Sequence, residues 1–136
     1  MLKPVLMLAL VLSITPSFAQ AAKCPVINGK FARIVERDGK FYRQTYYQYT
    51  RVERGVFSYN VNKDKSFQVA DGIPRPIRIG DQEGKISVLC GNNSVLLVSK
   101  VEDAEPYRIE VQPVDNDKIQ VTESDPARSG IYSIVL

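Results

Sequence analysis

The chain has 136 residues, of which 18 are Lys or Arg and 15 are Asp or Glu, and it contains no histidine. The charges are interspersed, which argues against the clustered basic surfaces that bind nucleic acids or anionic membranes. The absence of histidine excludes an imidazole general base and the Ser-His and Cys-His pairs of many hydrolases. We therefore expect a protein that is not an enzyme and that uses no cofactor.

The first residues have the pattern of a secretory signal peptide. Lys3 precedes an apolar run over residues 5–12, Pro16 ends that run, and small residues follow within 19–22. The apolar run is too short to span a bilayer. We predict a signal peptide over residues 1–21, with cleavage within residues 19–22, and a single domain over residues 22–136. The mature chain would be periplasmic or secreted, with no integral membrane association.

The two cysteines, Cys24 and Cys90, are far apart in the chain. In an oxidising compartment two cysteines are expected to pair. Their spacing matches neither a zinc site nor a Cys-x-x-Cys redox motif, so a metal or redox role is the weaker alternative. We predict a structural disulfide that holds the start of the mature chain.

Strand and turn signals dominate the rest of the chain. Asp38-Gly39 separates two strand-like runs and predicts a hairpin. Apolar residues at 107, 109 and 111 alternate with polar ones, which is the period of a strand. We predict a single antiparallel, meandering β-barrel of about eight to ten strands, closed by pairing residues 131–136 with 31–36. A two-sheet β-sandwich is the alternative. Further turns are predicted at Gly55 and at residues 62–65, 71–72, 91–93 and 115–118.

The stretch from residue 40 to residue 52, "KFYRQTYYQYTRV", is rich in tyrosine and glutamine. In one strand its side chains would alternate between two faces. The face with Tyr42, Gln44 and Tyr46 has no charge, whereas the other face carries Arg43 and Arg51. Arginine tolerates burial poorly, so the uncharged face is expected inside. Tyrosine also favours strands in general, so an ordinary strand remains an alternative to a ligand-lining one.

The loop "DGIPRPIRIG" at residues 71–80 is stiffened by Pro74 and Pro76. It could present Arg75 to the cleft of a partner, as an inhibitor of an extracytoplasmic hydrolase would. However, Pro76 directly follows this arginine and would distort a substrate-like register. The alternative interpretation is a stiff connection that leads into a strand.

These patterns lead to two hypotheses for function. The first is a non-enzymatic exported β-barrel that binds a small amphiphilic ligand in its lumen. Its predicted ligand-binding residues are Tyr42, Gln44, Tyr46, Phe57 and Tyr59. The second is a protein-binding module, or an inhibitor of an extracytoplasmic hydrolase, because Tyr and Arg are typical interface anchors. Its predicted contact residues are Arg43, Tyr47, Tyr49, Arg51 and Arg75.

Three short motifs carry a resemblance to known proteins. They are "CPVINGKFAR" from residue 24, "DGIPRPI" from residue 71, and Cys90 at a strand end before a Gly-Asn turn. Together they resemble small, uncharacterised exported β-barrel proteins of predatory Gram-negative bacteria. More distantly they are similar to lipocalin-type barrels, whose Gly-x-Trp motif has its counterpart in Gly29-Lys30-Phe31. The resemblance implies a β-barrel with a disulfide and implies no particular activity.

Overall fold

A computed structural model describes residues 23–61 and 66–136 of the protein, so the predicted signal peptide and the turn predicted at residues 62–65 lie outside the described residues. The described residues form β-strands and one short 3₁₀ turn, η1 (Pro126–Arg128). The strands are β1 (Gly29–Arg37), β2 (Lys40–Gln48), β3 (Thr50–Glu53), β4 (Val56–Asn60), β5 (Phe67–Val69), β6 (Arg75–Ile79), β7 (Gln82–Gly91), β8 (Ser94–Val101), β9 (Tyr107–Asp115), β10 (Lys118–Glu123) and β11 (Gly130–Ile134). Among residues 23–61 and 66–136, there is no helix long and apolar enough to cross a membrane.

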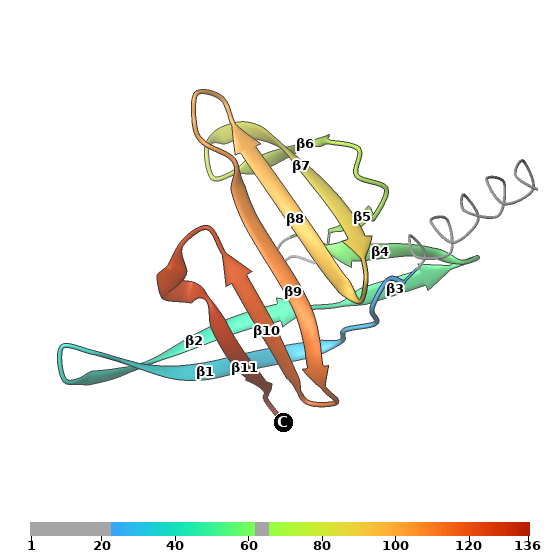
Figure 1. Ribbon diagram of the computed structural model, residues 1–136. Coiled ribbons are helices and arrows are strands. Elements are labelled where there is room, and N and C mark those ends of the chain that lie inside the picture. The colour runs from blue at the N-terminus through green and yellow to red at the C-terminus, as the bar shows by residue number, and fades with distance from the viewer. Residues whose placement is uncertain (1–22, 62–65) are drawn as a thin grey trace, which may run out of the picture.

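The strands form two antiparallel sheets (Figure 1). The larger sheet has the order β2-β1-β11-β10-β9-β8-β7-β6, and the smaller has the order β3-β4-β5. Most neighbours in the large sheet are consecutive in the chain, so the predicted all-β antiparallel meander is confirmed. The exception is β11, which pairs with β1 through Phe31 with Ile134 and Ala32 with Ser133. This contact confirms the predicted pairing of the last strand with an early one.

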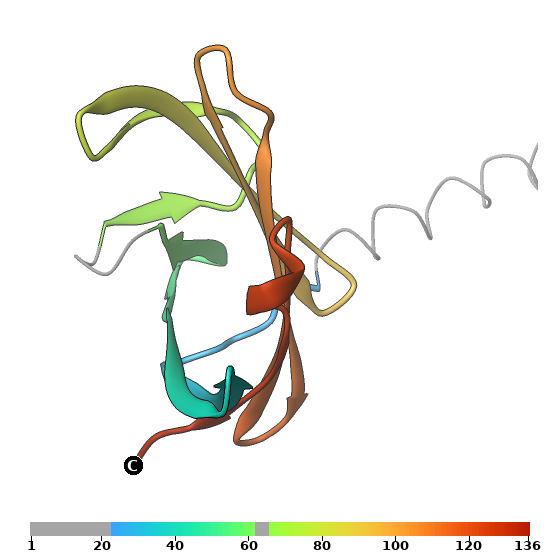
Figure 2. The same cartoon turned by 90° about the vertical axis from the view of Figure 1, so that its left-hand side faces the viewer.

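The predicted closed barrel is wrong, because β2 and β6 are the two edges of the large sheet and do not pair with each other. The physical reason lies at Tyr49, where the expected single strand over residues 40–52 divides into β2 and β3. Tyr49 donates its N–H to the side chain of Asn60 at 2.7 Å and accepts the Asn60 N–H at 3.3 Å. The chain thereby leaves the large sheet, and β3 starts a small second sheet. Figure 2 shows this small sheet facing the large one.

The hydrophobic core lies on the inner face of the large sheet. In β10, Ile119 and Val121 are buried and alternate with exposed Gln120 and Thr122, as a strand with one wet face requires. Tyr59 from the small sheet is fully buried and belongs to the same core. The two sheets therefore share one core, and residues 23–61 and 66–136 pack as a single unit.

The predicted disulfide is confirmed between Cys24 and Cys90, with the two Cα atoms 5.2 Å apart. Next to it, the Asn93 N–H donates to the Lys23 carbonyl at 3.0 Å. The bridge and this hydrogen bond fasten the N-terminal segment to the end of β7. Disulfides are typical of proteins that reside outside the cytoplasm.

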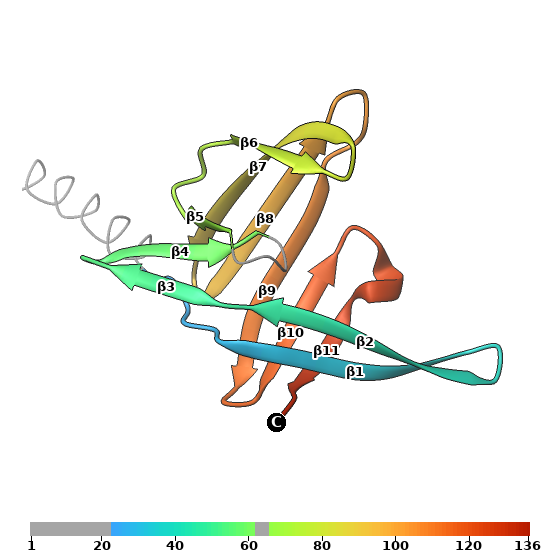
Figure 3. The ribbon, with the colours of Figure 1, turned by 180° about the vertical axis from the view of Figure 1, so that it is seen from behind.

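The predicted hairpin at Asp38-Gly39 is also confirmed. Both residues have positive φ angles, 54° and 75°, as the tight turn of a twisted hairpin requires. The far end of the hairpin projects beyond the rest of the molecule (Figures 1 and 3). We call this projecting segment, residues 34–43, the arm.

Candidate functional site

A cavity of about 190 Å³ opens between β2 and the inner face of the large sheet. Leu97 from β8 and Ile109 from β9 give it an apolar wall, and Arg128 from η1 gives it a positive charge. It is the hollow that lies nearest to the predicted ligand-lining face. Its lining consists of Thr45, Tyr46, Tyr47, Gln48, Asn60, Val61, Leu97, Ile109 and Arg128.

The turn that carries Arg128 is specified locally by its sequence. Asp125 caps η1, because its side chain accepts the Ala127 N–H at 3.0 Å, and Pro126 occupies the first helical position. Both residues are favoured at these places, since proline lacks the N–H that the first turn leaves unused. The turn therefore places Arg128 at a defined point beside β2.

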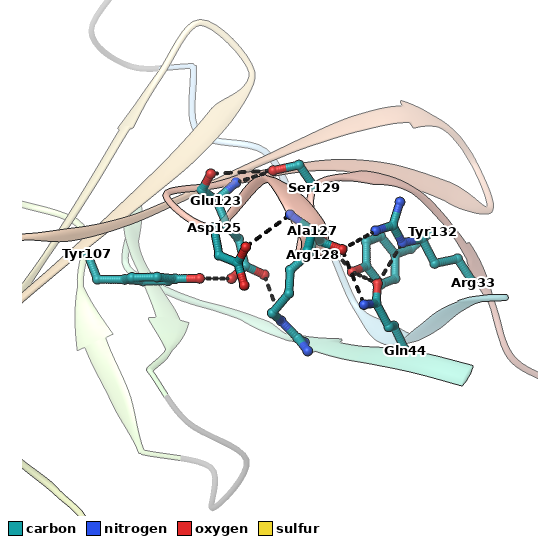
Figure 4. A network of polar contacts seen from close by, with 9 residues as sticks. All are labelled: Arg33, Gln44, Tyr107, Glu123, Asp125, Ala127, Arg128, Ser129 and Tyr132. Carbon is teal, nitrogen blue, oxygen red and sulfur yellow. Dashed lines mark hydrogen bonds and ion pairs between the residues drawn. The ribbon is translucent and has the colours of Figure 1, made fainter. Parts of the chain in front are cut away.

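A buried carboxylate holds the Arg128 side chain (Figure 4). Glu123 has a side chain that is only 3 % exposed, and its Oε2 accepts the Arg128 Nε–H at 3.4 Å. Its Oε1 accepts the hydroxyl of Tyr107. Burial, followed by this hydrogen bond, raises the pKa of Tyr107 to about 12. Glu123 thus has two partners, and one of them is the arginine of the cavity.

A second group of contacts attaches β2 and β1 to the same turn. Arg33 donates from Nε to Gln44 Oε1 and from Nη2 to the Ala127 carbonyl, both at 2.8 Å. Gln44 Nε2 donates to the Ala127 carbonyl at 3.3 Å, and the Tyr132 hydroxyl donates to the Arg128 carbonyl at 2.6 Å. These bonds fix the distance between the base of the arm and η1 (Figure 4).

Tyr46 lies between the cavity and this network. Its ring is 5.9 Å from the Tyr132 ring, centroid to centroid. Burial raises its pKa, and the nearby charge of Glu123 raises it further, so its hydroxyl remains protonated at neutral pH. Within residues 23–61 and 66–136, no hydrogen bond engages this hydroxyl. It is therefore a donor that a molecule in the cavity could use.

The other end of the cavity is closed by a pair of buried amides. Gln48 is 1 % exposed and Asn60 is 6 % exposed. Gln48 Nε2 donates to Asn60 Oδ1 at 3.0 Å, and Asn60 Nδ2 donates to the Tyr47 carbonyl at 3.2 Å. This joint connects the end of β2 to the end of β4, and so connects the two sheets.

No protein-family model, curated protein or solved structure matches this chain. The interpretation of the cavity depends on its own residues. Among the described residues, no group of three or more Cys, Asp or Glu side chains is placed to hold a metal ion.

Only one of the five predicted ligand-binding residues, Tyr46, lines the cavity. Gln44 is half-buried in the polar network, and Tyr42 is exposed on the arm. Phe57 packs against the core, whereas Tyr59 is fully buried and donates its hydroxyl to the Pro25 carbonyl at 2.6 Å. The structure does not bring these five together, because the arm leaves the body beyond Gln44 and the small sheet fills the interior with Tyr59.

Four of the predicted protein-contact residues flank the break between β2 and β3. Arg43 and Arg51 are exposed, whereas Tyr47 and Tyr49 are half-buried. The Arg51 guanidinium lies 4.2 Å from the centroid of the Phe67 ring, so it is partly engaged within the chain. The expected outward face is therefore not continuous, since its arginines belong to different sheets.

The fifth contact residue, Arg75, begins strand β6 rather than standing alone at a loop tip. Both of its terminal nitrogens bond the Asp71 carboxylate, at 2.9 and 2.6 Å. The hydrogen bond to Arg75 lowers the pKa of Asp71 to about 2. An arginine held in this way does not support the hypothesis of an inhibitory loop, and the stiff connection into a strand describes this segment.

Sequence reasoning missed Arg128, Leu97 and Ile109. The letters "SDPAR" at 124–128 do contain a signal for a helical turn, namely Asp followed by Pro. Nothing in them indicates that the turn lies beside β2, because that depends on how β11 returns to β1. Leu97 and Ile109 were predicted to lie in strands, but not to line a cavity.

A larger groove, about 800 Å³, lies on the outer face of β6, β7 and β8. Its polar lining carries both signs of charge, with Arg78 and Lys85 beside Glu83 and Glu102. Glu83 and Lys85 alternate with the buried Ile86 and Val88 of β7, so they lie on the outer face of the sheet. Its apolar lining residues are Pro74, Pro76, Ile77 and Val98.

Proposed function

We propose that the protein is a non-enzymatic, exported binding protein that holds a small anionic amphiphile in the cavity between its sheets. The observation that carries this proposal is the pairing of two polar groups, the Tyr46 hydroxyl and the Arg128 guanidinium, with an apolar wall. Such a wall with a few convergent polar groups is the usual composition of a small-molecule site. Export is supported by the disulfide and by the signal-like first residues.

The volume of the cavity is enough for the part of a ligand that is about the size of one ring. At roughly 30 Å³ per water, 190 Å³ holds about six water molecules. An apolar cavity of about 150 Å³ is known to admit benzene. The favoured ligand class is therefore an aromatic or short branched carboxylate, with its ring or chain against Leu97 and Ile109.

The expected negative charge of the ligand follows from the hydrogen bonds that the Arg128 guanidinium makes and leaves unmade. Its bond to Glu123 uses only Nε, at 3.4 Å, and its side chain is 41 % exposed. Within residues 23–61 and 66–136, no hydrogen bond engages its two terminal nitrogens. A carboxylate could accept from both of them in the paired geometry that arginine favours.

The resemblance to lipocalin-like barrels also has a place in this proposal. The two facing sheets would act as a barrel that is left open between β2 and β6. Closure is not required for binding, because the cavity is bounded by β2, the inner face of the large sheet and η1.

The proposal is tested by titrating benzoate into the exported protein and following amide chemical shifts by NMR. We expect saturable shifts at Tyr46, Leu97 and Ile109, and weaker shifts with the neutral analogue benzamide. Arg128→Gln should weaken binding by about tenfold or more, since a hydrogen bond to a charged group contributes about 1.5–3 kcal/mol. Tyr46→Phe should weaken it by a smaller factor.

The matched control is Arg108→Gln, which removes an exposed arginine on β9. If it weakened benzoate binding as much as Arg128→Gln does, the effect would be one of overall charge. Shifts spread over the surface, without saturation at the three cavity residues, would refute the proposal.

A further inference from the structure

The arm exposes large apolar side chains. Ile34 is 64 %, Phe41 72 % and Tyr42 49 % exposed. Strand β11 covers β1 only at Phe31 and Ala32, so the arm itself is a two-stranded ribbon. Such a ribbon is marginally stable on its own in water, and it exposes Ile34 and Phe41 on one face and Tyr42 on the other. Exposed apolar side chains of this size favour association. The arm therefore has the properties of a contact element.

The outer edge of β2 has backbone groups free for a further strand. Lys30 of β1 accepts the Val135 N–H, so its backbone groups face away from β2. Its partner Tyr47 in turn directs its carbonyl outward, to Asn60. Backbone groups alternate along a strand, so Phe41, Arg43 and Thr45 also direct their N–H and C=O groups outward. In the described part of the chain, no hydrogen bond engages the outward groups of these three residues.

The opposite edge of the large sheet differs in this respect. Strand β6 contains Pro76, and Pro74 precedes it. Proline lacks an N–H and is one of the features that protect sheet edges from pairing. Strand β2 contains no proline and no glycine. Of the two edges, β2 is therefore the one that can accept another strand.

The residues of β2 are complementary to a second copy of themselves. Gln44 is the middle of Lys40–Gln48, and two antiparallel copies centred on it pair through Arg43 and Thr45, whereas the outward carbonyl of Tyr47 is already bonded to Asn60. In that register Phe41 faces Tyr47 of the second copy, Tyr42 faces Tyr46, and Arg43 faces Thr45. Aromatic pairs stabilise neighbouring strands. No two like charges face each other, whereas centring the pair on Arg43 would place two arginines opposite each other.

We propose that the outer edge of β2 is a homodimerisation surface, on which two copies pair antiparallel around Gln44. Arg43 of each copy exchanges both backbone hydrogen bonds with Thr45 of the other, using the outward groups. Phe41 and Tyr42 of each arm gain aromatic neighbours from the other copy. This contact uses the backbone groups at the edge of β2, while the side chains of Thr45, Tyr46 and Tyr47 also line the cavity.

Sedimentation equilibrium of the exported protein over a range of concentrations tests this surface. We expect a reversible monomer–dimer equilibrium for the wild type. Thr45→Arg places two arginines opposite each other at both symmetric positions and should weaken dimerisation by about tenfold. Adding Arg43→Glu to that variant creates opposite charges at the same positions and should restore the dimer. Thr122→Arg, at an exposed position of β10, is the matched control and should leave the equilibrium unchanged.

A wild type that stays monomeric would overturn the proposal, and so would a dimer that is equally stable in Thr45→Arg and Thr122→Arg. Hydrogen exchange provides a test that needs no variant. The amide protons of Phe41, Arg43 and Thr45 should exchange more slowly as the protein concentration rises. Exchange at these amides that does not depend on concentration would also refute pairing along β2.

Discussion

Asn60 joins the two sheets, and replacing it should destabilise the protein more than its small size suggests. Its Oδ1 accepts from Gln48 Nε2 at 3.0 Å and from the Tyr49 N–H at 2.7 Å, and its Nδ2 donates to the Tyr47 carbonyl at 3.2 Å. In Asn60→Ala, the Gln48 amide would lose this acceptor inside the protein. An unsatisfied buried polar group costs about 1–3 kcal/mol. The backbone groups lie near the open edge of β2, where water can replace part of what they lose.

We therefore expect Asn60→Ala to lower the free energy of unfolding by about 3 kcal/mol, a large part of the roughly 5–15 kcal/mol typical of a domain. Urea unfolding followed by far-UV circular dichroism measures this change. Asn116→Ala, in the exposed turn between β9 and β10, is the matched control and should change the stability by less than about 0.5 kcal/mol.

A companion variant separates the loss of hydrogen bonds from the loss of packing. Gln48→Met with Asn60→Ala removes both polar partners, so no glutamine amide remains unsatisfied. It should be no less stable than Asn60→Ala alone, because removing both members of a pair costs less than removing one. If Asn60→Ala cost less than about 1 kcal/mol, or if the double variant were much less stable, the joint would not stabilise the fold in this way.

Three further outcomes are expected. Replacing Cys24 and Cys90 by alanine should lower the free energy of unfolding by about 4 kcal/mol, which is the loop-entropy value for a sequence separation of 66. An equal urea midpoint with and without the disulfide would contradict this. The urea midpoint should fall between pH 10 and pH 12, because the pKa of Tyr107 in the folded protein is raised to about 12. The stability that Tyr107 contributes is complete below pH 10 and is lost as the pH rises through the folded-state pKa. A midpoint that stays constant over this range would refute the expectation. Gly84→Ala should cost about 1–3 kcal/mol, because an added Cβ would lie 2.7 Å from a backbone oxygen of β8. Gly91→Ala, where the added Cβ meets nothing within 4 Å, should be tolerated, and thermal unfolding of both variants distinguishes them.

The strands and turns could be predicted because their signals are local. The Asp38-Gly39 turn and the alternation in Lys118–Glu123 need only neighbouring residues to be recognised. The break at Tyr49 could not be predicted in this way. It depends on Asn60, which follows it by eleven positions and supplies a side chain in place of a strand neighbour. This contact turned an expected closed barrel into two sheets.

The alternation of side chains along β2 predicted which residues are buried only for the part of the strand that packs against the rest of the protein. Tyr46 and Gln48 face inward, as the uncharged face predicts, but Tyr42 on the same face is half exposed. Alternation indicates which residues share a face, whereas burial depends on what lies opposite that face. Opposite Tyr46 lies the turn that carries Arg128, and opposite Tyr42 the described residues place no further strand.

Strand β2 therefore combines two roles that the sequence alone could not separate. Its inward side chains reach η1 and the cavity, where Gln44 accepts from the Arg33 guanidinium and Gln48 donates to the Asn60 amide. Within residues 23–61 and 66–136, the outward backbone groups of Phe41, Arg43 and Thr45 have no hydrogen-bond partner, and an exposed edge is normally protected by charge, proline or a covering segment. The opposite edge has proline at positions 74 and 76, and β2 has only Lys40 and Arg43 near its free end. A stretch so rich in tyrosine would be a liability at an unprotected edge unless another strand covers it. The symmetric placement of its aromatic residues around Gln44 identifies a second β2 as the strand that fits.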